Sequence, residues 1–263
     1  MTLFRQHFRG QRTGLLVWLG ANIAVTLMVA SLGNSASQSQ ALSQLVAGLP
    51  ANIQALFGLS PGLSPVDSFV QAKLGFTIIL VFPIYACLLA ISAVTREVDR
   101  HTADFLLALP IDRARLLLSR WAVMAVNIGI LGLGMWVALV AGLKGIGVTG
   151  SWWGYFWMVT QAWFLGVAVG SLALLASVWI DDYGAGTKYT LAGVGALFAL
   201  DLGMRVNPPP WWALIWNPFA HVDSARSIVE SRLLLGDAAA LVVITALALA
   251  LAVRFFADKQ IRA

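Results

Sequence analysis

Residues 121–142 read WAVMAVNIGILGLGMWVALVAG, a run that holds no Asp, Glu, Lys or Arg. An α-helix rises about 1.5 Å per residue, so a helix of this length covers the roughly 30 Å of hydrocarbon in a bilayer. Inside such a helix every backbone N–H and C=O group is paired within the segment, which the bilayer requires. The run therefore predicts a transmembrane helix.

Five further apolar runs flank this one along the chain. They lie at residues 15–32, 74–95, 155–179, 189–204 and 238–256. The run at 189–204 is short for a span and carries Asp201 near its end. No repeat and no long polar insertion separates the runs. We predict an all-α integral membrane protein in which residues 1–263 form a single domain with six transmembrane helices.

The composition of the chain agrees with a membrane protein. Of its 263 residues, 59% are hydrophobic and only 11% are charged, whereas soluble domains carry about 25% charged residues. So few polar side chains could not cover a core in water. The net charge of +5 comes from short basic clusters between the apolar runs and not from one patch, which argues against a nucleic-acid partner.

The basic residues are unevenly divided between the two sets of connecting segments. One set, which includes both termini, holds 12 of the 17 Lys and Arg residues, and the alternate set holds five. The positive-inside rule then predicts cytoplasmic N- and C-termini, which agrees with an even number of spans. Near the N-terminus, Leu3, Phe4 and Phe8 alternate with Arg5 and Arg9, which predicts an amphipathic helix on the cytoplasmic surface. Residues 40–57 and 219–234 are predicted to be helices that lie in the interface plane or dip into the outer leaflet. An ordinary extracytoplasmic loop with some helix is the alternative for both.

Several kinds of chemistry lack their sequence signals. There is no phosphate loop, no HExxH pattern among the three histidines, and a single cysteine, Cys87. The chain is therefore not expected to be an enzyme by itself, and we assign it no catalytic, cofactor-binding or metal-binding residue. Asp201 and Arg205, four residues apart, are expected to form an ion pair at the outer membrane boundary. A role in binding substrate or protons is the alternative.

A few small or neutral polar residues also lie within the predicted spans. Gly166 and Gly170 form a GxxxG step in the fourth span, which is expected to pack closely within the subunit. Asn22, Asn127 and Gln161 are expected to form hydrogen bonds between helices, and lining a pathway is the alternative.

The most informative connecting segment is residues 95–116, TREVDRHTADFLLALPIDRARL. Thr102 can cap a short helix, and Pro110 ends it, because the residue before a proline is pushed out of the α region. The resulting helix would lie across the cytoplasmic face with Leu106 and Leu107 exposed. An apolar patch rimmed by charges marks a partner site. The alternative is a surface helix that inserts these leucines into lipid.

These residues resemble the R-E-x(4)-T-x(3)-L-L-x(2)-P-x(2)-R pattern of ABC-2 type transporter permeases. The matching residues are Arg96, Glu97, Thr102, Leu106, Leu107, Pro110 and Arg113. The resemblance implies the membrane-spanning subunit of a bacterial ABC exporter in the inner membrane, with a coupling helix between spans two and three. It also implies a second permease copy or a homologous permease, and two copies of an ATP-binding subunit. ATP and Mg would be held by that partner, and no cofactor by this chain.

The function expected from the sequence is export of a hydrophobic or amphipathic substrate, driven by ATP hydrolysis in the separate subunit. A stand-alone secondary transporter or channel is one alternative. Such a carrier normally keeps ionisable groups near the middle of the membrane, and here they are nearly absent. A non-transporting membrane anchor or immunity protein is the other alternative, which only an activity measurement would separate.

Overall fold

A computed structural model describes residues 2–38, 48, 62–99, 113–180, 182–207, 209–210 and 214–258. Within these ranges all regular secondary structure is helical. The helices are α1 (Thr2–Gln38), α4 (Pro65–Val70), η1 (Gln71–Gly75), α5 (Phe76–Asp99), α7 (Arg113–Gly145), α8 (Trp152–Ser177), α9 (Tyr183–Val206), η2 (Pro218–His221), α11 (Ser224–Glu230) and α12 (Leu235–Asp258). Of the two elements labelled η, η1 is a π-helical turn and η2 is a 3₁₀ turn. The predicted segment at 40–57 lies outside the described residues except for Gly48.

Six helical segments are long and apolar enough to cross a membrane, which confirms the predicted number of spans. They are His7–Gly33, Pro65–Ser92, Ala114–Gly145, Trp152–Ser177, Tyr183–Val206 and Leu235–Phe256. The fifth is longer than the predicted 189–204. Its N-cap is Asp182, whose carboxylate accepts a hydrogen bond from the Ala185 N–H, and this cap starts the helix ahead of the apolar run.

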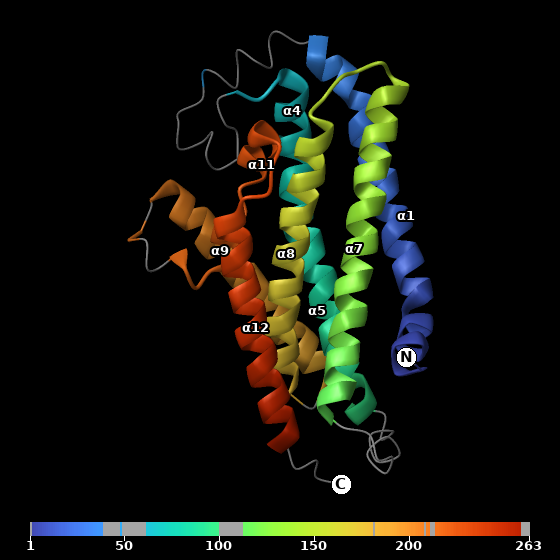
Figure 1. Cartoon of the computed structure of the whole chain (residues 1–263), viewed down its shortest axis with the longest axis vertical. Helices are drawn as coiled ribbons and strands as arrows, with labels where there is room; N and C mark the ends of the chain where they lie inside the picture. The colour runs from blue at the N-terminus through green and yellow to red at the C-terminus, as the bar shows by residue number, and fades with distance from the viewer. Residues whose placement is uncertain are drawn as a thin grey trace.

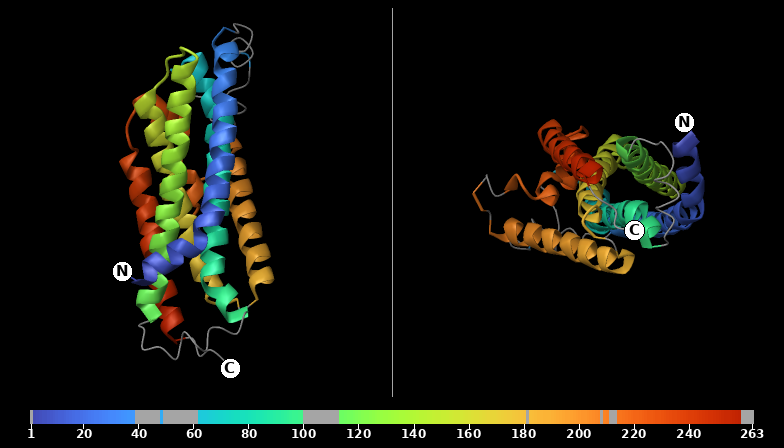
Figure 2. Two further views of the ribbon diagram at one scale, coloured as in Figure 1. Left: turned by 90° about the vertical axis from the view of Figure 1, so that its right-hand side faces the viewer. Right: turned by 90° about the horizontal axis from the view of Figure 1, so that it is seen from below.

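The helices form an elongated bundle with α5 and α8 at its centre (Figure 1). α1 packs against α7 on one side, and α12 packs against α8 on the other. α9 lies at the edge of the bundle, where its main contact is with α5 (Figure 2). α1 begins and α12 ends towards the lower end of Figure 1, which we call the terminal end. The opposite end is called the far end.

The N-terminal residues and the first span form one continuous helix, in which the stretch suited to cross a membrane begins at His7. α1 is one helix from Thr2 to Gln38, and its first turns lean across α7 near the terminal end (Figure 2). There Asn127 of α7 donates a hydrogen bond to Gln11 at 2.7 Å, and the Arg120 Nε lies 3.4 Å from the His7 Nε2. The polar face of the predicted amphipathic helix is thus partly used to bind α7.

Two glycines of α8 allow it to lie close to α5 and α7, as the GxxxG step predicted. A Cβ atom at Gly170 would lie 2.6 Å from the Met124 Sδ and 2.9 Å from the Ala86 Cβ. One at Gly166 would lie 3.2 Å from the Phe82 Cβ. Lipid gives helices no hydrophobic drive to associate, so close backbone approach and dense packing stabilise the pair.

This packing predicts that Gly170→Ala destabilises the protein. The added methyl group overlaps Ala86, and overpacking a core costs about 1–3 kcal/mol. We expect the midpoint of thermal unfolding in detergent to fall by about 2–10 °C. Gly20→Ala is the matched control, because nothing lies within 4 Å of a Cβ atom at Gly20. An equal effect of the two substitutions would contradict close packing at Gly170.

Candidate functional site

The residues that match the permease pattern lie around the connection between α5 and α7. Arg96 and Glu97 lie in the last turns of α5, and Arg113 is the first residue of α7. Both helix ends lie at the terminal end of the bundle (Figure 1). The other four predicted coupling residues, Thr102, Leu106, Leu107 and Pro110, lie outside the described residues.

At the far end, the buried carboxylate of Asp67 joins α4 to α8. Its Oδ1 accepts hydrogen bonds from the Tyr155 hydroxyl at 2.6 Å and from the Ser151 N–H at 3.2 Å. Its Oδ2 accepts a hydrogen bond from the Ser64 hydroxyl at 2.6 Å. The Ser64 Oγ in turn accepts a hydrogen bond from the Asp67 N–H at 3.1 Å. Both carboxylate oxygens are therefore partnered, which a charge at this depth requires.

Sequence reasoning missed Asp67, although a signal for its local structure was present. Ser64 and Asp67 stand at the N-cap and N3 positions of α4, with Pro65 between them at the start of the helix. Ser64 is an N-cap, whose Oγ accepts a hydrogen bond from the Asp67 N–H, and a proline is favoured at the first helical position. The pattern predicts the start of a helix, but it does not identify Tyr155 as a partner of the carboxylate.

Residues 217–234, which contain η2 and α11, pack on the side of the bundle against α8, α9 and α12, and we call them the cap segment. Ser151 fixes it to the start of α8. The Ser151 Oγ lies 3.2 Å from the Ile228 carbonyl oxygen, to which it donates, and 2.9 Å from the Ser231 Oγ. A Cβ atom at Gly154 would lie 2.5 Å from the same carbonyl oxygen, so α11 lies directly on the first turn of α8.

The apolar side chains of the cap segment are buried in the protein. Phe219, Val222 and Ile228 are at most 1% exposed. The sequence had predicted an interfacial helix that presents such residues to lipid. They face the protein because α11 packs on α8 while η2 packs on α8, α9 and α12.

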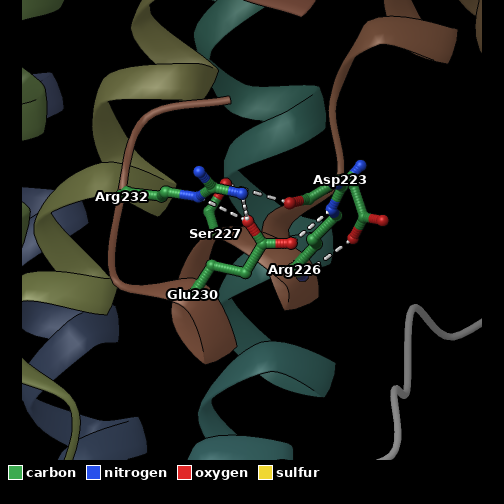
Figure 3. A network of polar contacts seen from close by, with 5 residues as sticks. All are labelled: Asp223, Arg226, Ser227, Glu230 and Arg232. Atoms are coloured by element: carbon green, nitrogen blue, oxygen red, sulfur yellow. Dashed lines mark hydrogen bonds and ion pairs between the residues drawn. The ribbon is translucent and has the colours of Figure 1, made fainter. Parts of the chain in front are cut away.

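A network of charged residues stabilises α11 (Figure 3). Asp223 caps the helix by accepting the Arg226 N–H at 2.9 Å. Glu230 accepts from Arg226 and from Arg232, both at 2.6 Å. Hydrogen bonds from these two guanidinium groups lower the pKa of the Glu230 carboxyl group, and the bond from Arg226 has the larger effect. The network also spans the turn at Ser231, whose φ of 47° is in the left-handed region.

The predicted ion pair of Asp201 and Arg205 is confirmed, and it also holds the cap segment. The Arg205 Nε lies 2.7 Å from the Asp201 Oδ2, and Asp201 is only 2% exposed. The Arg205 Nη2 donates to the Val222 carbonyl oxygen at 3.2 Å. Asn217, which belongs to the cap segment, donates a hydrogen bond to the Leu197 carbonyl oxygen of α9 at 3.1 Å. α9 is thus joined to the cap segment at two points.

His221 joins the cap segment to α12. Its Nδ1 lies 3.6 Å from the Asp237 Oδ1, and its Nε2 lies 3.3 Å from the Ile215 carbonyl oxygen. Both ring nitrogens face acceptors, and only the protonated imidazolium can donate to both. The Asp237 carboxylate is the main cause that raises the pKa of His221 above its usual range, and partial burial opposes it. From α8, Gln161 donates to the His221 carbonyl oxygen at 2.8 Å, which is the kind of helix-linking role predicted for it.

A mainly apolar groove runs between α1 and η1–α5 and has a volume of about 120 Å³. Trp18, Asn22 and Val25 line it from α1, and Thr77 and Val81 line it from α5. Its lining is mostly hydrocarbon and aromatic, and Asn22 and Thr77 supply its polar groups. Over the part of the chain that the structure describes, no group of three or more His, Cys, Asp or Glu residues could hold a metal ion.

The geometry of Asp67 predicts a large loss of stability in Asp67→Ala. The substitution leaves the buried Tyr155 hydroxyl and the Ser151 N–H without their acceptor, at about 1–3 kcal/mol for each unpaired group. Tyr155→Phe removes only one of these donors, so we expect a smaller fall in the unfolding midpoint. In the double variant of Asp67→Ala with Tyr155→Phe, the unfolding midpoint should fall by less than the sum of the two single effects. Asp182→Ala, which removes an exposed N-cap carboxylate, is the control and should cost about 1 kcal/mol. Additive effects of the Asp67 and Tyr155 substitutions would contradict their direct coupling.

The pKa of His221 predicts that the cap segment is held more firmly at acid pH. Because the folded-state pKa is raised, the stabilisation is fully present below the unfolded pKa of about 6.5 and is lost as pH rises through the folded pKa. Hydrogen exchange of the amides of residues 218–230 should therefore become more protected as pH falls, after correction for the intrinsic rate. His221→Gln should abolish this dependence, and so should Asp237→Asn. A dependence that persists in both variants would exclude His221 as its source.

Comparison with known proteins agrees with the permease pattern. The sequence model of the family described as ABC-2 family transporter protein matches residues 1–200, which extend from α1 into α9. No curated protein sequence matches the chain. The family match covers most of the chain, and the structure holds six helices suited to cross a membrane. The chain therefore belongs to the ABC-2 family of transporter proteins and is a multi-pass membrane permease of that family.

Proposed function

We propose that this permease is the membrane-spanning subunit of an ATP-driven exporter for a hydrophobic or amphipathic substrate. The observation that carries the proposal is the family match over residues 1–200, together with the coupling pattern between α5 and α7. ATP and Mg would be bound and hydrolysed by a separate ATP-binding subunit in two copies. The terminal end would face the cytosol, because its segments hold most of the basic residues.

In this proposal the segment from Arg96 to Arg113 transmits the motion of the ATPase to the spans. It directly continues α5 and leads into α7, and both helices contact α8. A displacement of the segment would therefore reach the centre of the bundle through rigid helices. ATP can drive the motion only through a difference in ATPase contacts between two states of the permease.

The exposed face of α9 supports pairing with a second permease. Ala192, Gly195, Ala199 and Gly203 recur at spacings of three or four residues and are all exposed. Nothing in the chain lies within 4 Å of a Cβ atom at Gly195 or Gly203. Small residues at this spacing let a neighbouring helix approach closely in a membrane.

The groove between α1 and α5 supports an apolar or amphipathic substrate. It is lined mostly by hydrocarbon and aromatic groups, with Asn22 and Thr77 as polar contacts. The Thr77 hydroxyl already donates to the Lys73 carbonyl oxygen at 2.6 Å. A substrate with a long apolar part and one hydrogen-bonding group would match this lining, whereas a multiply charged ion would not.

The partners of the buried carboxylates argue against a proton-coupled carrier. Asp67 accepts hydrogen bonds from Tyr155, Ser151 and Ser64, and Asp201 is paired with Arg205. Both carboxylates hold neighbouring elements together at the far end. A group that carries protons across the membrane must instead exchange them with both sides.

The coupling proposal predicts that Leu106→Asp combined with Leu107→Asp separates the permease from its ATPase. The two carboxylates would remove the apolar contact with the groove of the ATPase, while insertion in the membrane is kept. Co-purification of the ATP-binding subunit with the tagged permease measures the complex. Leu106→Met with Leu107→Met is the matched control, and it should retain the partner. A complex that survives both aspartates would exclude the coupling role, and full transport in vesicles without ATP would exclude an ATP-driven exporter.

A further inference from the structure

An open pocket lies between the start of α8, the cap segment and the start of α12, and its volume is about 640 Å³. That volume is within the range of about 300–1,000 Å³ that is usual for sites of small molecules. Two arginines supply most of its charge, and the rest of its wall is largely apolar. We call it the interfacial pocket, and its main lining residues are Trp157, Arg226, Arg232, Leu233, Leu235 and Asp237.

The interfacial pocket lies at the boundary of the membrane, because two spans begin beside it. The sixth span starts at Leu235, and Trp157 belongs to the second turn of the fourth span. Leu235 is 73% exposed, so its side chain is free to contact lipid. Arg232 stands three residues ahead of the sixth span. Trp and Arg side chains at the end of a span are typical of the depth at which lipid headgroups lie.

The carboxylate of Glu230 holds the two arginines of the pocket next to each other (Figure 3). The Arg226 Nε donates to its Oε1, while the Arg232 Nε and Nη2 lie against its Oε2, each at 2.6 Å. A guanidinium group carries five N–H donors, so both arginines keep donors for a further acceptor. Their side chains are 55% and 70% exposed, so a ligand can reach them.

The lining fits a molecule that has one small anionic group and a long apolar part. Guanidinium groups bind phosphate through paired hydrogen bonds. Among the charges that line the pocket, Asp237 is opposed by both arginines, and it also lies 3.6 Å from His221. A soluble anion would leave Leu233, Leu235 and Trp157 uncovered. A phospholipid carries both a phosphate and acyl chains, and it is present at this depth of the membrane.

We infer that the interfacial pocket binds one phospholipid, whose phosphate is held by Arg226 and Arg232. One acyl chain of this lipid lies along Leu233, Leu235 and Trp157. The lipid belongs to the leaflet at the far end, and it joins the cap segment to the start of α8 and of α12. This site goes beyond the proposed export function, because it shares no lining residue with the groove between α1 and α5.

Thermal unfolding of the delipidated protein in detergent tests for the site. Added phosphatidylethanolamine should raise the unfolding midpoint by about 3–10 °C, because a ligand of the folded state stabilises it. A glycosyl diacylglycerol with the same acyl chains lacks the phosphate and should raise the midpoint much less. Inorganic phosphate without lipid should not raise it. Equal protection by the glycolipid would indicate general contact with hydrocarbon, and protection by inorganic phosphate would indicate a site for a soluble anion. Either result would overturn the proposal.

Substitutions at the arginines test where the lipid binds. Arg226→Gln combined with Arg232→Gln should remove most of the lipid-dependent rise and weaken lipid retention in native mass spectrometry by about tenfold or more. Glu230→Gln is the matched control, because it breaks the same ion pairs but keeps both guanidinium groups. It should keep the lipid-dependent rise even if the midpoint without lipid falls.

A second control separates the pocket from the general effect of removing an arginine. Arg254 is exposed near the other end of α12, and Arg254→Gln should retain the lipid as the wild type does. Wild-type retention in the variant that lacks both Arg226 and Arg232 would overturn the proposal. None of these measurements depends on whether the protein exports a substrate, so this site and the proposed function can fail separately.

Discussion

Close packing of α8 against α5 and α7 is the constraint on which the rest of the bundle depends. In lipid, apolar side chains gain little by leaving the solvent, so helices associate through dense contact and hydrogen bonds. Gly166 and Gly170 permit that contact by leaving room for Phe82, Met124 and Ala86. The remaining spans are arranged around this central group. α1 packs against α7, α12 packs against α8, and α9 packs mainly against α5.

Polar groups decide how the cap segment is held against the bundle. A buried polar group in a membrane protein must find its partners within the protein, and here Asp67, Asp201 and Gln161 all find them in or beside the cap segment. Asp67 binds the start of α8, to which Ser151 fixes α11. Gln161 and Arg205 bind the backbone of η2 and its neighbour Val222. The cap segment is therefore positioned by specific hydrogen bonds as well as by burial of its apolar side chains.

The weakly packed helices include α9, to which the proposed function assigns a partner. α1 and α9 expose most of their length, whereas α5 and α8 are largely buried. A central pair that stays packed and an outer helix with a smooth face of small residues suit a permease that pairs with a second copy. In the proposed function the charged connection at the terminal end would receive the motion of the ATPase. The cap segment holds α8, α9 and α12 together.

The amino-acid sequence by itself determined the membrane class, the number of spans, the close packing at Gly166 and Gly170, and the ion pair of Asp201 with Arg205. These features follow from hydrophobicity and helical spacing, which act between residues near in the chain. Most of the coupling segment was predicted from a motif alone, and the structure describes only its two ends.

Only the tertiary structure decided the partners of Asp67, which lie 84 and 88 residues away at Ser151 and Tyr155. It also decided the contact of His221 with Asp237, the π-helical turn at Gln71 and the burial of the cap segment within the protein. Such contacts depend on which helices become neighbours, and that choice is made by packing over the whole chain and not by the order of residues within any one span.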